Sequence, residues 1–223
     1  MDDSSFEKDE AVSEAWLNGL WSVSDPVNER SFYEETSSFY EDAMIELEWK
    51  APELSMVTLE NYEKESGLKI PRDCLIMDVG AGTGLSGEAM RKAGFSGTID
   101  ALEPSQKMFE KAIEKNIYSK YYSDFLIGNK ETTVSGDYYD LVVSVGVLGK
   151  RSVRNKSLYE ILRMAKQGGL VLTMMVKESF DEMHFKETIN EVTGDGKATL
   201  EYSETFDRCY RNHSAIGFII KKS

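Results

Sequence analysis

The segment Asp78–Gly84 is the part of the sequence best suited to chemistry, because it concentrates glycine between an apolar stretch and a helical pattern. Gly80, Gly82 and Gly84 lack Cβ atoms, so the backbone around them can turn tightly and touch a ligand. The N-terminus of the helix that follows offers unpaired N–H groups and partial positive charge. The segment therefore predicts a ligand site at the carboxyl end of a strand.

The spacing of the glycines is compatible with two classes of ligand. Counted from Gly82, the sequence matches the dinucleotide fingerprint G-x-G-x-x-G, and Glu103 follows about twenty residues later, as that fingerprint requires. Counted from Gly80, which comes directly after the strand, the spacing is G-x-G-x-G. Asp78 at the strand end suits a cationic ligand and would repel a pyrophosphate. The second spacing is therefore favoured, and an NAD site remains the alternative.

The elements that must position these residues alternate along the chain from Ile70 onward. Short apolar runs predict strands, and the segments between them have helical periodicity, as in βαβ units. No helical pattern separates the last two strands, so a hairpin with one antiparallel strand is expected. The predicted fold class is α/β: a doubly wound, mostly parallel, seven-stranded, Rossmann-like sheet with a final hairpin and helices on both faces. The predicted strands are 75–79, 97–102, 118–122, 141–145, 169–175, 199–206 and 215–221, and the predicted helices are 85–93, 105–115, 155–165 and 179–192.

The N-terminal part has a different pattern. Two helices are predicted at 31–48 and 52–66, and the second has Pro52 in its first turn and Gly67 after its end. Residues 1–30 are polar and acidic apart from one amphipathic patch with two tryptophans. We expect residues 31–223 to form a single domain and residues 1–30 to be an acidic tail or a lid.

Composition limits the partners that the protein can have. The formal net charge is −13, which repels phosphate backbones and anionic lipid, so neither nucleic acid nor membrane is expected as a partner. The basic cluster at 150–156 is interpreted as a solvated loop. Cys74 and Cys209 lack the spacing of a zinc site, and no apolar stretch is long enough to span a bilayer. A monomer in the reducing cytoplasm, without a metal, is expected.

Three motifs resemble those of class I S-adenosylmethionine-dependent methyltransferases. The segment Asp78–Gly84 resembles their first motif, and Ala101–Ser105 with Met108 resembles the motif after their second strand. The turn Lys166–Gly169 resembles the K-P-G-G turn before their fifth strand, with Gln167 in place of proline. The resemblance covers residues 70–176 and implies S-adenosylmethionine as cofactor, with S-adenosylhomocysteine as product.

A closer resemblance extends outside these motifs. Tyr33 and Tyr40, followed by the segment Trp49–Pro52, are similar to the leader of the Williams–Beuren-region methyltransferase-like family. The segment Phe185–Thr188 is similar to that family's Y-K-E-T motif. The chain departs from the family pattern at Thr36, where tryptophan is usual, and at Trp49, where tyrosine is usual.

The class resemblance implies a role for each residue of the expected site. Glu103 would bind the ribose hydroxyls, and Asp78 would lie near the amino group of the methionine part. Tyr40 and Tyr33 would close the site from the N-terminal helix. The other expected contacts are Gly80, Ala81, Gly82 and Gly84 around the methionine part, Pro104, Met108, Asp124 and Phe125 around the adenine, and Ser144 and Gly146 at the methyl-donor end.

The function expected from these features is S-adenosylmethionine-dependent methylation of a small molecule, with a protein acceptor as a variant. Methyl transfer from a sulfonium needs mainly positioning, so no fixed catalytic dyad is required. His184 and His213 are the only histidines, and Ser144–Leu148 does not resemble the N-P-P-Y motif of amino-group methyltransferases. Two alternatives remain open: a non-catalytic binder of S-adenosylmethionine or S-adenosylhomocysteine, and an NAD-dependent oxidoreductase.

Overall fold

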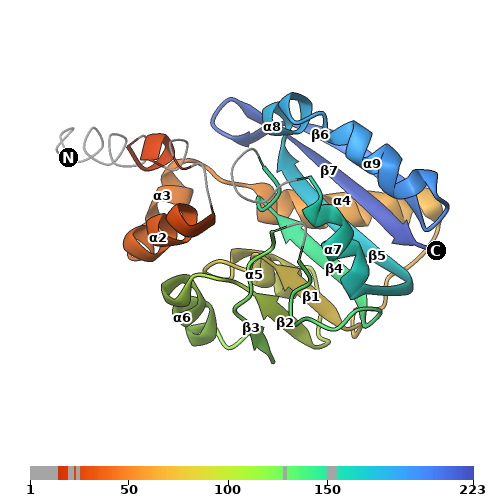
Figure 1. Cartoon of the computed structure of the whole chain (residues 1–223), viewed down its shortest axis with the longest axis horizontal. Coiled ribbons are helices and arrows are strands. Elements are labelled where there is room, and N and C mark those ends of the chain that lie inside the picture. The colour runs from red at the N-terminus through yellow and green to blue at the C-terminus, as the bar shows by residue number, and fades with distance from the viewer. Residues whose placement is uncertain (1–14, 20–22, 24–25, 128–129, 150–154) are drawn as a thin grey trace.

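One sheet of seven strands, in the order β3-β2-β1-β4-β5-β7-β6, forms the centre of the described structure (Figure 1). The computed structural model describes residues 15–19, 23, 26–127, 130–149 and 155–223. The neighbouring strands are parallel except that β7 runs antiparallel to β5 and β6. The predicted fold class, including the C-terminal hairpin, is confirmed. The strands are β1 (Ile76–Val79), β2 (Ile99–Leu102), β3 (Tyr121–Tyr122), β4 (Tyr139–Val145), β5 (Ala165–Val176), β6 (Ala198–Tyr210) and β7 (His213–Lys222).

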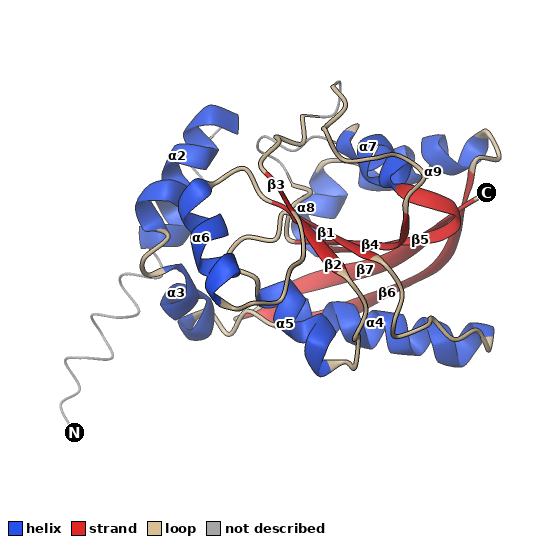
Figure 2. Cartoon of the chain, turned by 90° about the horizontal axis from the view of Figure 1, so that it is seen from below, coloured by secondary structure: helices blue, strands red, loops and turns tan. Residues whose placement is uncertain are grey.

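Each face of the sheet carries its own apolar core. Successive side chains of a strand point to opposite faces, so Ile76 of β1 belongs to one core and Met77 to the other. Both side chains are fully buried. Figure 2 shows α4 and α5 on one side of the sheet and α7, α8 and α9 on the other. The helices are α4 (Ala51–Ser66), α5 (Leu85–Lys92), α6 (Gln106–Glu114), α7 (Ser157–Met164), α8 (Lys177–Glu182) and α9 (Phe185–Gly194).

The region 31–48, predicted as one helix, contains two, α2 (Pro26–Thr36) and α3 (Tyr40–Glu46). The hydroxyl of Thr36 donates to a backbone carbonyl of α2 at 2.8 Å, and the hydroxyl of Ser37 does the same at 3.2 Å. Side-chain bonds of this kind compete with helix continuation. The single-helix prediction was wrong, because a turn at 37–39 separates α2 from α3, with the N–H of Phe39 donating to the carbonyl of Thr36 at 3.2 Å.

Two other predicted elements also differ. The region 179–192 is divided into α8 and α9, because His184 between them has φ 50°, which does not fit an α-helix. The strand predicted at 118–122 is reduced to the two residues of β3. Tyr118 instead turns its hydroxyl toward Asp78 beneath the glycine-rich loop, at 2.7 Å.

The N-terminal helices form a small aromatic layer at one end of the sheet (Figure 1). Trp16 is 5% exposed and packs against Phe32, Tyr33 and Tyr40, with ring centroids 5.5 to 6.4 Å away. The boundary expected at residue 30 lies within α2. The second tryptophan of the predicted amphipathic patch, Trp21, and the basic cluster at 150–154 lie outside the described residues.

Candidate functional site

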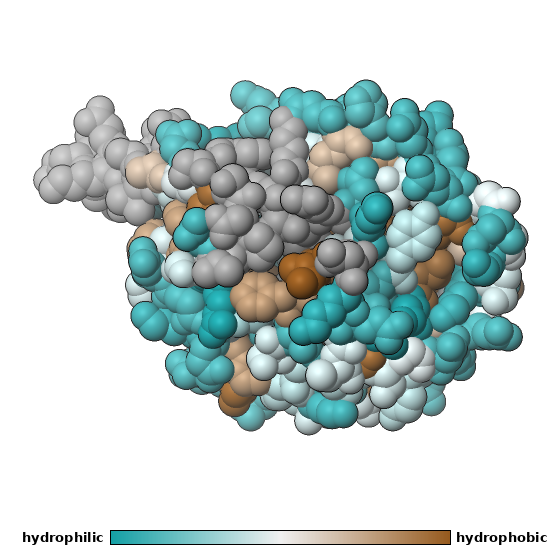
Figure 3. Space-filling view, in the orientation of Figure 1, coloured by the Kyte–Doolittle hydropathy of each residue, from teal (hydrophilic) through white to brown (hydrophobic). Residues whose placement is uncertain are grey.

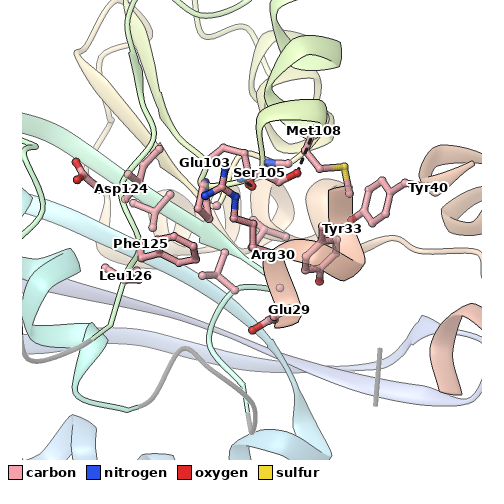
Figure 4. Close-up of a pocket in the computed structure, with 18 residues that line it drawn as sticks. Glu29, Arg30, Tyr33, Tyr40, Glu103, Ser105, Met108, Asp124, Phe125 and Leu126 are labelled. Atoms are coloured by element: carbon pink, nitrogen blue, oxygen red, sulfur yellow. Dashed lines mark hydrogen bonds between the residues drawn. The ribbon is translucent and has the colours of Figure 1, made fainter. Parts of the chain in front are cut away.

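A pocket lies at the carboxyl ends of β1, β2 and β4, bordered by α2 (Figure 4). Its walls are mostly apolar with a few polar groups, as is typical of small-ligand sites. The carboxyl end of the strands is where doubly wound sheets bind ligands. The residues expected from the sequence that line this pocket are Tyr33, Tyr40, Gly80, Gly82, Glu103, Pro104, Met108, Asp124, Phe125 and Gly146.

Other walls of the pocket were not expected from the sequence. Glu29 and Arg30 of α2 line it together with Tyr33. They lie four and three residues before Tyr33, respectively, and this helical spacing was the signal that could have found them. The remaining residues flank expected ones in the chain: Val79, Leu102, Ser105, Leu126, Val145 and Val147.

Four expected residues do not line this pocket. Ala81 lines a smaller neighbouring pocket, whereas Asp78, Gly84 and Ser144 line neither of the two. Asp78 and Ser144 are fully buried. Gly84 faces α6, since a Cβ atom there would lie 3.3 Å from the side chain of Lys115. Any effect of Asp78, Gly84 or Ser144 on a ligand in these pockets therefore acts through the surrounding backbone.

The glycine-rich loop is held in place by the end of β2. Gly80 and Ala81 donate their N–H groups to the carbonyl of Leu102, at 2.7 and 3.1 Å. Gly80 and Gly82 have φ 69° and 56°, in the left-handed region that glycine tolerates best. The loop ends at Gly84, the N-cap of α5. These bonds place the loop backbone directly between the strand ends and the pocket.

The smaller pocket adjoins the larger one along this loop. The two share Tyr40, Gly80, Gly82 and Val145 as lining residues. The smaller pocket also reaches the first residues of α5 and Thr83. A helix N-terminus suits the carboxylate of a ligand.

Glu103 connects the loop to the helix that follows β2. Its carboxylate accepts the N–H of Gly82 at 2.9 Å and the N–H of Ser105 at 2.8 Å. Burial raises the pKa of Glu103 to about 7, against the effect of these two hydrogen bonds, and the charges of Asp78 and Glu34 raise it further. Each carboxylate oxygen can accept a second hydrogen bond, so Glu103 can bind two hydroxyl groups in the pocket.

Asp78 is a buried support beneath the loop. Ser86 and Tyr118 donate their hydroxyls to one carboxylate oxygen at 2.7 Å each, and the other oxygen has no hydrogen-bond partner. Burial raises the pKa of Asp78 to about 6, against the effect of these two hydrogen bonds. The side chain joins the start of α5 to the segment before β3.

We expect the substitution Asp78→Asn to change how stability depends on pH. Because the pKa of Asp78 is raised from 3.8 to about 6, the native state binds the proton more tightly than the unfolded state. This group therefore lowers the free energy of unfolding as pH rises from about 4 to about 6, by about 3 kcal/mol in all. Denaturant unfolding at pH 4, 5, 6 and 7 should show that difference between wild type and Asp78→Asn. Parallel pH profiles of the two proteins would contradict it.

Asp124 lies at the pocket, but its carboxylate bonds elsewhere. It accepts the N–H of Thr133 at 2.9 Å and also the hydroxyl of Thr133. Figure 4 shows the Asp124 carboxylate turned away from Glu103 and Arg30. Phe125 and Leu126, the next residues, supply the apolar wall on this side.

The described residues contain neither a metal site nor a membrane-spanning helix. Within the described ranges, no group of three or more His, Cys, Asp and Glu side chains could hold a metal ion. No helix in the same ranges is long and apolar enough to cross a membrane.

This topology, with a glycine-rich loop after β1 and an acidic residue after β2, matches the Rossmann-like fold of methyltransferases. The family model described as "Methyltransferase domain" matches residues 77–173. The structure of magnesium protoporphyrin IX methyltransferase from Synechocystis PCC 6803 with bound S-adenosylmethionine has the same fold, with a TM-score of 0.55. That likeness covers 77% of this chain and 79% of the other, at 17% sequence identity.

Among particular proteins, the chain is similar to human methyltransferase-like protein 27, with 26% identity over 75% of this chain and 65% of the relative. This agrees with the family-level resemblance of the segments around Tyr33 and Phe185. Malonyl-[acyl-carrier protein] O-methyltransferase of Halalkalibacterium halodurans is 31% identical over 58% of this chain and 48% of that protein. The chain thus spans between about half and two thirds of these relatives.

Proposed function

We propose that the protein transfers the methyl group of S-adenosylmethionine to a small molecule. The observation that carries this proposal is Glu103, a buried carboxylate that joins the glycine loop to the N-terminus of α6 and faces the larger pocket. Two hydroxyls of a ribose fit its remaining acceptor positions. Glu29 and Asp124 add negative charge to the lining against the positive charge of Arg30, which favours a cationic sulfonium.

The two pockets share lining residues along the glycine-rich loop, so we assign one part of the cofactor to each. We assign the adenosine part to the larger pocket, between the apolar side chains of Pro104, Met108 and Phe125. The methionine part would lie along the loop, with its carboxylate at the N-terminus of α5 near Thr83. Asp78 supports this loop from behind.

The chain contributes positioning and exclusion of water to the reaction. The bound cofactor supplies a methyl group already activated by the positive sulfur. Tyr40 lines both pockets and is half-buried. Its removal from solvent and the charges of Glu103 and Glu41 raise its pKa, so it stays a neutral phenol. Val145, Gly146 and Val147 border the pocket where the acceptor would approach. Positioning of this kind can supply most of the catalysis.

We propose an acceptor other than an exocyclic amine, because Ser144–Leu148 lacks an N-P-P-Y motif. The acceptor that we propose is a small molecule, and a protein acceptor stays the variant. We further propose that residues 31–223 act as one domain, as a monomer in the cytoplasm, with residues 1–30 as a tail or lid.

Calorimetric titration with S-adenosylmethionine, S-adenosylhomocysteine and NAD tests the cofactor. Micromolar binding of the first two without NAD supports the proposal. Binding of NAD alone would favour the oxidoreductase alternative. Methyl transfer to a panel of hydroxyl, carboxylate, thiol and amine acceptors then separates an enzyme from a non-catalytic binder, which would turn over none of them.

Cofactor binding should weaken at acidic pH. Ribose hydroxyls donate to the ionised form of Glu103, whose pKa of about 7 then falls on binding, so protonation opposes binding. The affinity for 5′-methylthioadenosine, which lacks the amino acid part, should be roughly tenfold lower at pH 6 than at pH 8. Calorimetry in two buffers at each pH measures the proton release that accompanies binding. Asp78→Asn should keep this dependence, and a pH-independent affinity would contradict the role of Glu103.

A further inference from the structure

Helix α2 is attached to the helix that follows Glu103. The carboxylate of Glu34 in α2 accepts the backbone N–H groups of Gln106 and Lys107, at 2.6 and 3.3 Å. These are the first residues of α6, so Glu34 satisfies unpaired donors of that helix and lies at its positive end. In addition, Lys115 after α6 pairs with Glu41 of α3 at 2.9 Å. The N-terminal layer is therefore fixed relative to the larger pocket.

Arg30, one turn before Glu34, extends from this fixed helix into the pocket. Its Nε lies 3.5 Å from a carboxylate oxygen of Glu34, and its guanidinium carbon lies 5.8 Å from the centre of the Phe125 ring. Figure 4 shows the Arg30 side chain near Glu103 and Phe125, with Tyr33 lying between it and Tyr40. The side chain is 45% exposed, which leaves it room to shift.

The planar guanidinium of Arg30 lies over the aromatic ring of Phe125, and we call the space between these two groups the slot. A planar ring needs about 3.5 Å on each face, or about 7 Å between its neighbours. The present separation of 5.8 Å would therefore have to widen by roughly 1 Å for a ring to enter. Pro104, Met108 and Leu126 make the rest of this end apolar. Guanidinium stacks well on aromatic faces, which an ammonium group does less well.

We infer that Arg30 stacks on the adenine ring of the cofactor, on the face opposite Phe125, and that Glu34 holds it in place. The inference rests on the proposed cofactor site. It makes Arg30 a specificity-determining residue for the purine end of the cofactor, carried by the helix that borders the pocket. We assign Arg30 no contact with the methionine part, because Arg30 does not line the smaller pocket.

The test compares Arg30→Ala, Arg30→Lys and Arg208→Ala as a matched control. Arg208 is 67% exposed, pairs with Glu48 at 3.6 Å and does not line the pocket. The ligands are S-adenosylhomocysteine and 5′-methylthioadenosine, both of which contain adenine. Arg30→Ala should weaken both by roughly tenfold, the size of a base-stacking contribution, without changing the unfolding midpoint of the free protein. Arg30→Lys should recover little of the loss, and Arg208→Ala should stay within about twofold.

The outcomes separate the inference from the proposed function. Unchanged or tighter binding by Arg30→Ala would overturn the inference, since Arg30 would then be neutral or an obstacle. Full recovery in Arg30→Lys would also overturn it, because charge alone would suffice. Weakening of S-adenosylhomocysteine but not of 5′-methylthioadenosine would place Arg30 at the methionine end instead. If the wild-type protein binds neither ligand, the proposed function itself fails.

Discussion

Replacing Glu103 with alanine is expected to weaken the binding of S-adenosylhomocysteine by about a hundredfold or more. In the proposed complex the carboxylate accepts two ribose hydroxyls, and each hydrogen bond to a charged group contributes about 1.5–3 kcal/mol. The sum of about 3–6 kcal/mol corresponds to at least a hundredfold in affinity. The variant also removes the acceptor of the Gly82 N–H, which holds the loop against the pocket. Calorimetry with wild type and variant measures the change directly.

A control must show that the loss is local. Glu60 of α4 is more than half exposed and pairs with Lys64 at 4.0 Å. Its side chain is therefore held much less firmly than that of Glu103. Glu60→Ala should bind S-adenosylhomocysteine as the wild type does. Glu103→Ala should remain folded. The variant loses two hydrogen bonds, but it also removes a buried carboxylate whose charged form burial disfavours, and the two effects offset each other. Wild-type affinity in Glu103→Ala would mean that the ribose binds elsewhere.

The fold was predictable because its signals are local. The strands of the sheet centre are continuous apolar runs, and β1 and β4 are almost entirely buried. Helix α4 was predicted with its limits, because Pro52 stands in its first turn and Gly67 at its end takes φ 71°. The G-x-G-x-G spacing likewise predicted a loop that the structure places beside the pocket. Each of these features depends on residues a few positions apart.

The N-terminal layer could not be predicted in the same way. Its position depends on Glu34 reaching α6, more than seventy residues later in the chain, and no local pattern encodes such a contact. The role expected for Asp124 depends on the direction of its carboxylate, which the bond with Thr133 determines. The helical spacing from Tyr33 could have placed Arg30 at the pocket, but its contact with Phe125, which is distant in sequence, could not be predicted. Such contacts are set by tertiary packing.

The substitution Gly80→Ala is expected to destabilise the protein by about 3 kcal/mol and to abolish measurable cofactor binding. Two costs add at this position. An alanine at φ 69° pays about 1–2 kcal/mol for the left-handed conformation. Its Cβ would also lie 2.2 Å from Cγ2 of Val147, and forcing an extra methyl into such a site costs a further 1–3 kcal/mol. Denaturant unfolding and calorimetry with S-adenosylhomocysteine check the two effects separately.

Two further variants distinguish the clash from the backbone strain. Gly67→Ala introduces the same residue at φ 71°, where no atom lies within 4 Å of the new Cβ, so it should cost only the conformational part of about 1–2 kcal/mol. In Gly80→Ala with Val147→Ala, the obstructing Cγ2 is gone, and the added cost of Gly80→Ala should fall to that of Gly67→Ala. If Val147→Ala brings no recovery, the loop is limited by its own backbone. The double variant could instead regain stability and still fail to bind the cofactor. The added methyl group at residue 80 would then obstruct the ligand and not the protein, so contact with the cofactor would require glycine at this position.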